Sequence, residues 1–67
     1  MSLSENLKQL RQQRGFTLEE TAESVNVTRQ AICKYEQGKM IPNGLVLVDL
    51  AIFLGTTAEK LVYGKEQ

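Results

Sequence analysis

Helix-breaking residues divide this chain of 67 residues into short segments, and they limit its possible folds more than any other feature. Gly can adopt backbone conformations that other residues rarely adopt, and Pro cannot continue a helix. The breaks occur at Gly15, Gly38, Pro42-Asn43-Gly44, Gly55 and Gly64. No segment between them alternates apolar and polar residues for long enough to predict a strand. We therefore expect an all-α fold of about five short helices, in a single domain that spans residues 1–67.

Apolar residues recur at helical spacing in the first and last parts of the chain. The first helix is expected to begin near Ser4, a residue type that caps helices, and to end at Gly15. The expected buried faces are Leu3, Leu7 and Leu10 in this helix, Leu47, Leu50, Ala51 and Leu54 in a helix between Asn43 and Gly55, and Ala58, Leu61 and Val62 in a last helix capped by Thr57.

Two short helices are predicted in the middle of the chain. Thr17 can accept a hydrogen bond from the amide of Glu20, whose carboxylate can accept one from the Thr17 amide, so the sequence TLEE predicts a capping box. This helix is expected to stop near Val25-Asn26, because Asn enters the left-handed region readily. A third helix is expected to begin at a second threonine cap, Thr28, and to end at Gly38.

The turn between these two helices has the pattern of a helix-turn-helix motif over residues 17–37. Ala22 is small where the two helix axes must cross, Asn26 suits a sharp turn, and Val27 is apolar inside that turn. Ile32 is the apolar residue in the middle of the next helix. In this motif the second helix lies in the major groove of DNA, and its N-terminal residues contact base edges.

The chain resembles the phage repressor and Cro type of helix-turn-helix domain, also called the XRE family. The resemblance extends from about Leu7 to Val62 and depends on LKQLRQQRGFTLEETAESVNVTRQAICKYEQGKMIP and, more loosely, on LAIFLGTTAEKLV. It implies a lambda-repressor-like fold. It also implies a sequence-specific double-stranded DNA-binding transcriptional regulator, expected to be a repressor. The homodimer expected below would read a palindromic operator.

The resemblance assigns base reading to Thr28, Arg29, Gln30 and Lys34, and their chemistry agrees. Arg can make a bidentate pair with guanine, Gln can make one with adenine, and the Thr methyl group can meet a thymine methyl. Lys34, one turn further along, can reach a guanine or a phosphate. The alternative is an ordinary solvated helix face, which every small domain has.

Phosphate contacts are expected at two places, because free backbone amides at helix ends attract anions. These contacts are assigned to Thr17 and Leu18 at the start of one helix, and to Gln37, Gly38 and Lys39 after the next. Relatives commonly carry Gln where this chain has Leu18, and a leucine side chain cannot bind phosphate. Gly38 also has a purely structural interpretation as a helix C-cap.

Arg11 and Glu36 are assigned by the resemblance to an internal ion pair between the first and third helices. Removing one partner of a buried pair costs about 3–5 kcal/mol. If both charges were exposed instead, the pair would contribute only about 0–1 kcal/mol.

The charge balance predicts a weak basic surface. Eight Lys and Arg residues equal eight Asp and Glu residues, but the distribution of charge matters more for DNA binding than the sum. Arg29, Lys34 and Lys39 are expected on the contact surface with no acid among them except Glu36, which is assigned inward, while Glu19, Glu20 and Glu23 cluster on the preceding helix. A single copy should therefore bind DNA poorly.

The helix between Asn43 and Gly55 carries a second set of apolar residues opposite its core face. A helix that is apolar all round is buried on both sides. We therefore expect a homodimer interface at Leu45, Val48 and Ile52, extended by Ile41. The alternatives are an end helix that wraps over this face, or scattered exposed apolar residues.

Other classes of protein fit the composition poorly. The chain has no His and one Cys, Cys33, so we expect no zinc site, no disulfide and no other cofactor. Because no disulfide can form within the chain, we expect a cytoplasmic location. No membrane span, catalytic residues or small-molecule effector are expected either. The remaining alternative to a DNA-binding regulator is an antitoxin-type or other protein-binding module.

Overall fold

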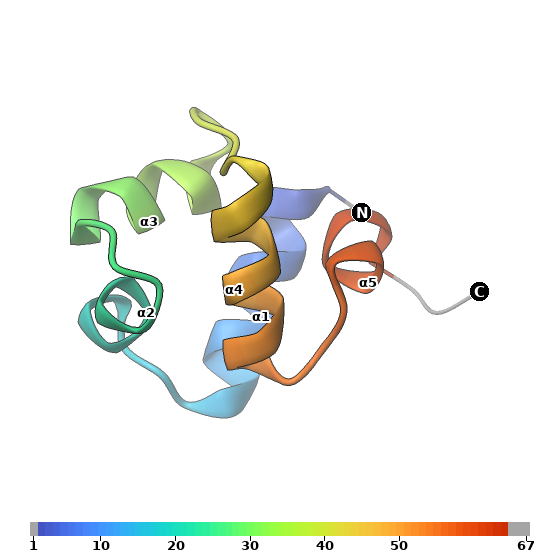
Figure 1. Ribbon diagram of the computed structural model, residues 1–67, viewed down its shortest axis with the longest axis horizontal. Coiled ribbons are helices and arrows are strands. Elements are labelled where there is room, and N and C mark those ends of the chain that lie inside the picture. The colour runs from blue at the N-terminus through green and yellow to red at the C-terminus, as the bar shows by residue number, and fades with distance from the viewer. Residues whose placement is uncertain (1, 65–67) are drawn as a thin grey trace.

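The computed structural model describes residues 2–64, and within that range it contains five α-helices and no strand. The helices are α1 (Leu3–Arg14), α2 (Leu18–Ser24), α3 (Arg29–Gln37), α4 (Gly44–Leu54) and α5 (Ala58–Tyr63), as Figure 1 shows. The all-α prediction is confirmed. Met1 and residues 65–67 of the expected domain lie outside the described residues. None of the described helices is long and apolar enough to cross a bilayer.

The start of α1 differs from the prediction. Its N-cap is Ser2, not Ser4, because Glu5 completes a capping box with Ser2. The Glu5 amide donates to Ser2 Oγ at 3.3 Å, and the Ser2 amide donates to Glu5 Oε1 at 3.2 Å. The prediction of Ser4 was wrong because the chain has two serines in its first four residues, and only Ser2 has Glu three residues later.

The other four helices begin behind the capping residues that the sequence contains. Thr17, Thr28, Asn43 and Thr57 each accept a hydrogen bond from the amide three residues on, at 3.0 to 3.1 Å. Such caps satisfy amides that have no partner inside the helix. The boundaries of the helices are therefore fixed by local side-chain chemistry.

The core lies where α1, α3, α4 and α5 meet. Leu7, Ile32, Leu50, Leu54 and Leu61 are fully buried there. α2 contributes Ala22 and Val25 to the same core. In Figure 1, α1 lies behind α4, with the α2–α3 pair on one side and α5 on the other. This arrangement holds one side of α3 against the core and leaves its other side at the surface.

A buried polar contact fixes α5 to α1. Asn6 is 4% exposed, and its Nδ2 donates to the Leu61 carbonyl oxygen at 2.9 Å. The end of α5 packs closely here, since a Cβ added at its C-cap, Gly64, would lie only 3.1 Å from Asn6 Nδ2. The bond joins residues at opposite ends of the chain.

Asn6→Ala should lower the free energy of unfolding by about 1–3 kcal/mol, because the Leu61 carbonyl loses its side-chain donor in a buried place. Urea denaturation followed by circular dichroism measures the change. Gln9→Ala is the matched control, since Gln9 is exposed on the same helix and its loss should change stability by less than about 0.5 kcal/mol. Equal effects of the two substitutions would contradict a stabilising role for Asn6.

Candidate nucleic-acid interface

The turn between α2 and α3 positions the third helix. Asn26 adopts φ 60°, and it is the one non-glycine residue among residues 2–64 with a positive φ. The Val27 amide then donates back to the Ala22 carbonyl at 3.0 Å. Val25 is buried, and Val27 packs against the core. The predicted turn chemistry therefore appears at the expected residue and directs α3 across α2.

The N-terminal end of α3 projects from the molecule. Thr28, Arg29 and Gln30 are exposed, and Lys34 is exposed one turn further along. The opposite side of the helix buries Ile32 and Tyr35. All four residues assigned to base reading therefore lie on the solvent side of α3.

Gln30, Lys34 and Gln37 form one exposed row along α3, because their spacing of four and three residues places them on the same side of a helix. The Thr28 hydroxyl is used differently. Its Oγ1 accepts from the Ala31 amide at 3.1 Å, and the O–H donor and the methyl group remain for an external contact.

An ion pair links α3 to α2 at this end of the helix. Arg29 Nε lies 3.1 Å from Glu19 Oε2, and the two side chains are 57% and 65% exposed. The expectation that no acid except Glu36 would lie among the basic residues of this surface was therefore wrong. Sequence spacing gave no signal for this pair, because its partners belong to different helices whose crossing angle brings them together.

Arg11 and Glu36, the residues assigned to an internal pair, contact each other between α1 and α3. Arg11 Nε donates to Glu36 Oε2 at 2.6 Å and Nη2 donates to Oε1 at 3.1 Å, while Nη1 donates to the Phe16 carbonyl oxygen at 2.9 Å. The two side chains are only 12% and 7% exposed. The hydrogen bond to Glu36 raises the pKa of Arg11 above its ordinary value. Glu36 is therefore directed inward and does not oppose a bound polyanion.

The C-terminal end of α3 uses its own amides for capping. Gly38 adopts φ 75°, a conformation that L side chains rarely adopt. Its amide donates to the Tyr35 carbonyl at 3.3 Å, and the Lys39 amide donates to the Lys34 carbonyl at 2.9 Å. Both amides are occupied, so the exposed side chains of Gln37 and Lys39 are the groups here that can reach a phosphate.

Two backbone amides at the N-terminal end of α2 are likewise used in capping. The Thr17 amide donates to Glu20 Oε1 at 2.8 Å, and the Glu20 amide donates to Thr17 Oγ1 at 3.0 Å. Leu18 packs its side chain against the core. The capping box leaves the amides of Leu18 and Glu19 for a phosphate, beside two carboxylates.

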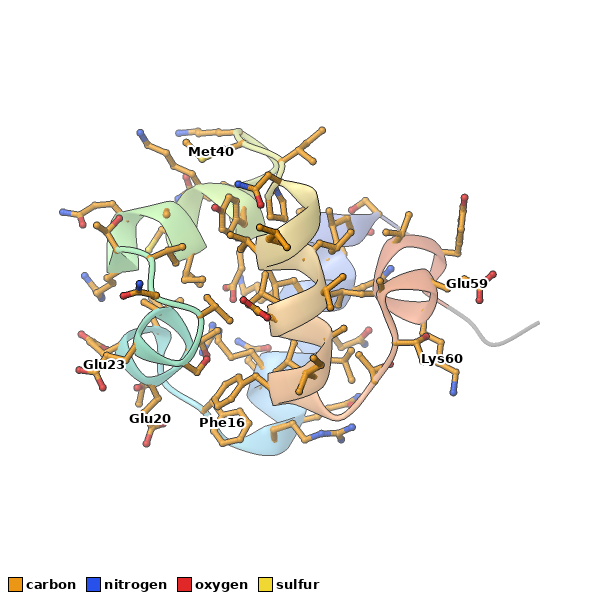
Figure 2. All side chains as sticks on the ribbon, in the orientation of Figure 1. Phe16, Glu20, Glu23, Met40, Glu59 and Lys60 are labelled. Carbon is orange, nitrogen blue, oxygen red and sulfur yellow. The ribbon has the colours of Figure 1, made fainter. Side chains whose placement is uncertain are left out.

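Apart from the Arg29–Glu19 pair, the acids of α2 and the lysines near the C-terminal end of α3 lie on different sides of the α2–α3 pair. In Figure 2, Glu20 and Glu23 point from α2 away from α3, and Met40 marks the loop beyond the other end of α3. Lys34 and Lys39 belong to that end and are exposed. A local basic surface therefore coexists with zero net charge. Within residues 2–64, no group of His, Cys, Asp or Glu is arranged to hold a metal ion.

A row of apolar side chains on α4 and the loop before it is exposed. Leu45 is 81%, Ile52 is 70%, Ile41 is 80% and Val48 is 47% exposed. α5 packs on α1 and α4 but leaves these four side chains exposed. The alternative of an end helix over this face is therefore wrong for the described residues. We call these four residues the apolar face.

Comparisons with known proteins agree with this geometry. The family model described as "Helix-turn-helix" matches residues 7–61. The chain is 39% identical over 98% of its length to the HTH-type transcriptional activator BcrR of Enterococcus faecalis. It spans between 32% and 56% of the length of the curated relatives that it matches.

Solved structures share the fold. The P22 c2 repressor, in complex with a synthetic operator, superposes with a TM-score of 0.93 at 23% identity, covering 97% of this chain and 98% of the repressor. The biofilm regulator SinR, in complex with DNA, gives a TM-score of 0.81 at 23% identity, covering 88% and 95%. The family match and the arrangement of α2 and α3 lead to one conclusion: the chain belongs to the helix-turn-helix family, in its phage-repressor and Cro type, also called XRE.

Proposed function

We propose that the chain is a sequence-specific double-stranded DNA-binding domain of a transcriptional regulator, and that it places α3 in the major groove. The observation that carries this proposal is the exposed N-terminal end of α3, with Thr28, Arg29 and Gln30 on its solvent side. A helix end of this kind can enter the groove and meet base edges. The P22 c2 repressor and SinR, whose fold the chain shares, were solved with DNA.

Base reading would be divided among Thr28, which caps α3, and three exposed residues of the helix itself. Arg29 suits guanine and Gln30 suits adenine, because each can form two parallel hydrogen bonds with that base. Thr28 offers a methyl group for thymine, while its hydroxyl oxygen caps the helix. Lys34 lies on the same row as Gln30 and reaches a guanine or a phosphate.

Phosphate contacts would flank this reading surface. Lys39 and Gln37 lie at the C-terminal end of α3 and act through their side chains, with Gly38 permitting the close turn between them. At the other side, the backbone at Thr17 and Leu18 offers amides and no positive side chain. Because few cations neutralise phosphates, one copy should bind DNA weakly and with a shallow salt dependence.

A homodimer would compensate for this weakness. The apolar face is exposed in the single chain, and a second copy related by two-fold symmetry could bury it. Such a dimer sets two recognition helices about 34 Å apart, one turn of DNA, and so reads a palindrome. We propose repression as the mode of regulation, because occupying an operator is enough to block a promoter.

The test is selection of binding sites from random DNA, with Arg29→Ala and Gln30→Ala alongside the parent. A base-reading role predicts that each variant loses preference at a defined base pair, at a cost of about 1–3 kcal/mol. Lys8→Ala is the control for losing an exposed side chain outside α3, because Lys8 is exposed on α1. Uniform weakening on all sequences would show that the two side chains contact only the DNA backbone.

The apolar face also favours a second candidate, a module that binds a different protein, as an antitoxin does. A hydrophobic partner surface could cover Leu45 and Ile52 as well as a second copy could. Sedimentation separates the candidates, because a purified chain that dimerises alone supports the first. A chain that stays monomeric and copurifies with another protein supports the second.

A further inference from the structure

The Arg29–Glu19 pair occupies the position where a DNA-binding helix would read its first base. Arg29 is the first residue of α3, and the first turn of this helix contains no acid of its own. A cation at a helix N-terminus is disfavoured by the helix dipole. Glu19 supplies the missing negative charge from α2, at 3.1 Å. Its neighbour Glu20 is used in the capping box instead.

The geometry of the pair leaves part of the guanidinium free. Glu19 Oε2 contacts Nε of Arg29. A guanidinium has five N–H donors in a fixed plane, and its two terminal nitrogens present a separate edge. That edge can make the two parallel hydrogen bonds that recognise guanine. The carboxylate therefore lies beside Nε without occupying the edge that reads a base.

We propose that Glu19 is a positioning residue that determines specificity, by directing the free edge of Arg29 toward a guanine. This inference depends on the proposed function, DNA reading by α3. The charge of Glu19 has a second effect. A carboxylate beside Arg29 repels phosphates, so it lowers the affinity for DNA of any sequence. Glu19 thus favours recognition of the correct base over attachment to the backbone.

Glu19→Gln tests the proposal, with Glu23→Gln as the matched control. Glu23 is an exposed acid of the same helix, its side chain points away from α3 (Figure 2), and its substitution changes the net charge equally. Affinities are measured by fluorescence anisotropy for the selected operator, for the operator changed at the base pair that Arg29 reads, and for random DNA.

Glu19→Gln should reduce the ratio of affinities between the intact and the changed operator by about two- to fivefold, the range for an exposed ion pair. Glu23→Gln should leave that ratio unchanged, although both variants should bind random DNA more tightly. In the Arg29→Ala background, Glu19→Gln should no longer affect the ratio.

Equal ratios for Glu19→Gln and Glu23→Gln would overturn the positioning role, and so would a persistent effect of Glu19→Gln without Arg29. Failure of the proposed function has a different signature. In that case the parent itself would not distinguish the intact from the changed operator, whatever residue stands at position 19. The parent measurement therefore separates the two failures.

Discussion

Arg11→Met is expected to lower the free energy of unfolding by about 3–5 kcal/mol. The substitution leaves the Glu36 carboxylate, whose side chain is 7% exposed, without its cation. It also removes the donor to the Phe16 carbonyl. A domain of this length has a total stability of about 3–10 kcal/mol. The loss is therefore a large fraction of the total, and the variant should unfold at a much lower temperature and urea concentration than the parent.

Thermal and urea denaturation measure this loss, with Lys8→Met as the control. Lys8 lies exposed on the same helix, so the control also replaces a cation by Met and removes one charge, but at an exposed position. Its effect should stay within about 0.5 kcal/mol. The double variant Arg11→Met/Glu36→Met should recover much of the loss, because two apolar side chains can replace a buried pair. A single variant as stable as the control would show that the pair contributes little.

Ile52→Lys should convert a dimer into a monomer and weaken binding to a palindromic operator by about a hundredfold or more, the gain that linking two binding events provides. Ile52 lies within the apolar face, and a charge there would have to be buried without a partner. Affinity for an isolated half-site should remain within a few-fold of the parent, because α3 is unchanged. Sedimentation and fluorescence anisotropy give the two readouts.

Gln9→Lys controls for the added charge. Gln9 is exposed on α1, beside Glu5, Lys8 and Gln12 and away from the apolar face. This variant should sediment and bind like the parent. The dimer assignment fails if the parent and Ile52→Lys sediment alike, whether as monomers or as dimers.

Local chemistry accounts for the parts of the fold that the sequence predicts well. A capping threonine, an asparagine in a turn and a helix-ending glycine act on residues at most a few positions away, so Thr17, Asn26 and Gly38 can be assigned from the sequence. Helical periodicity likewise identifies the buried side of α4, with Leu50, Ala51 and Leu54 inward.

Contacts between helices could not be predicted in this way. The Arg29–Glu19 pair and the bond from Asn6 to Leu61 depend on crossing angles and distances that no local pattern encodes. The Arg11–Glu36 contact was expected only because the chain resembles a known family. Even the start of α1 was misplaced, since two nearby serines compete for one cap.

The apolar face has a consequence for gene control. If operator binding requires two copies, and most of the chain is monomeric in the cell, the amount of paired protein grows with the square of the total. A doubling of expression then raises occupancy of a mostly empty operator about fourfold. The sharpness of the genetic response would thus depend on Leu45 and Ile52, which belong to α4 and not to the helix proposed to read DNA.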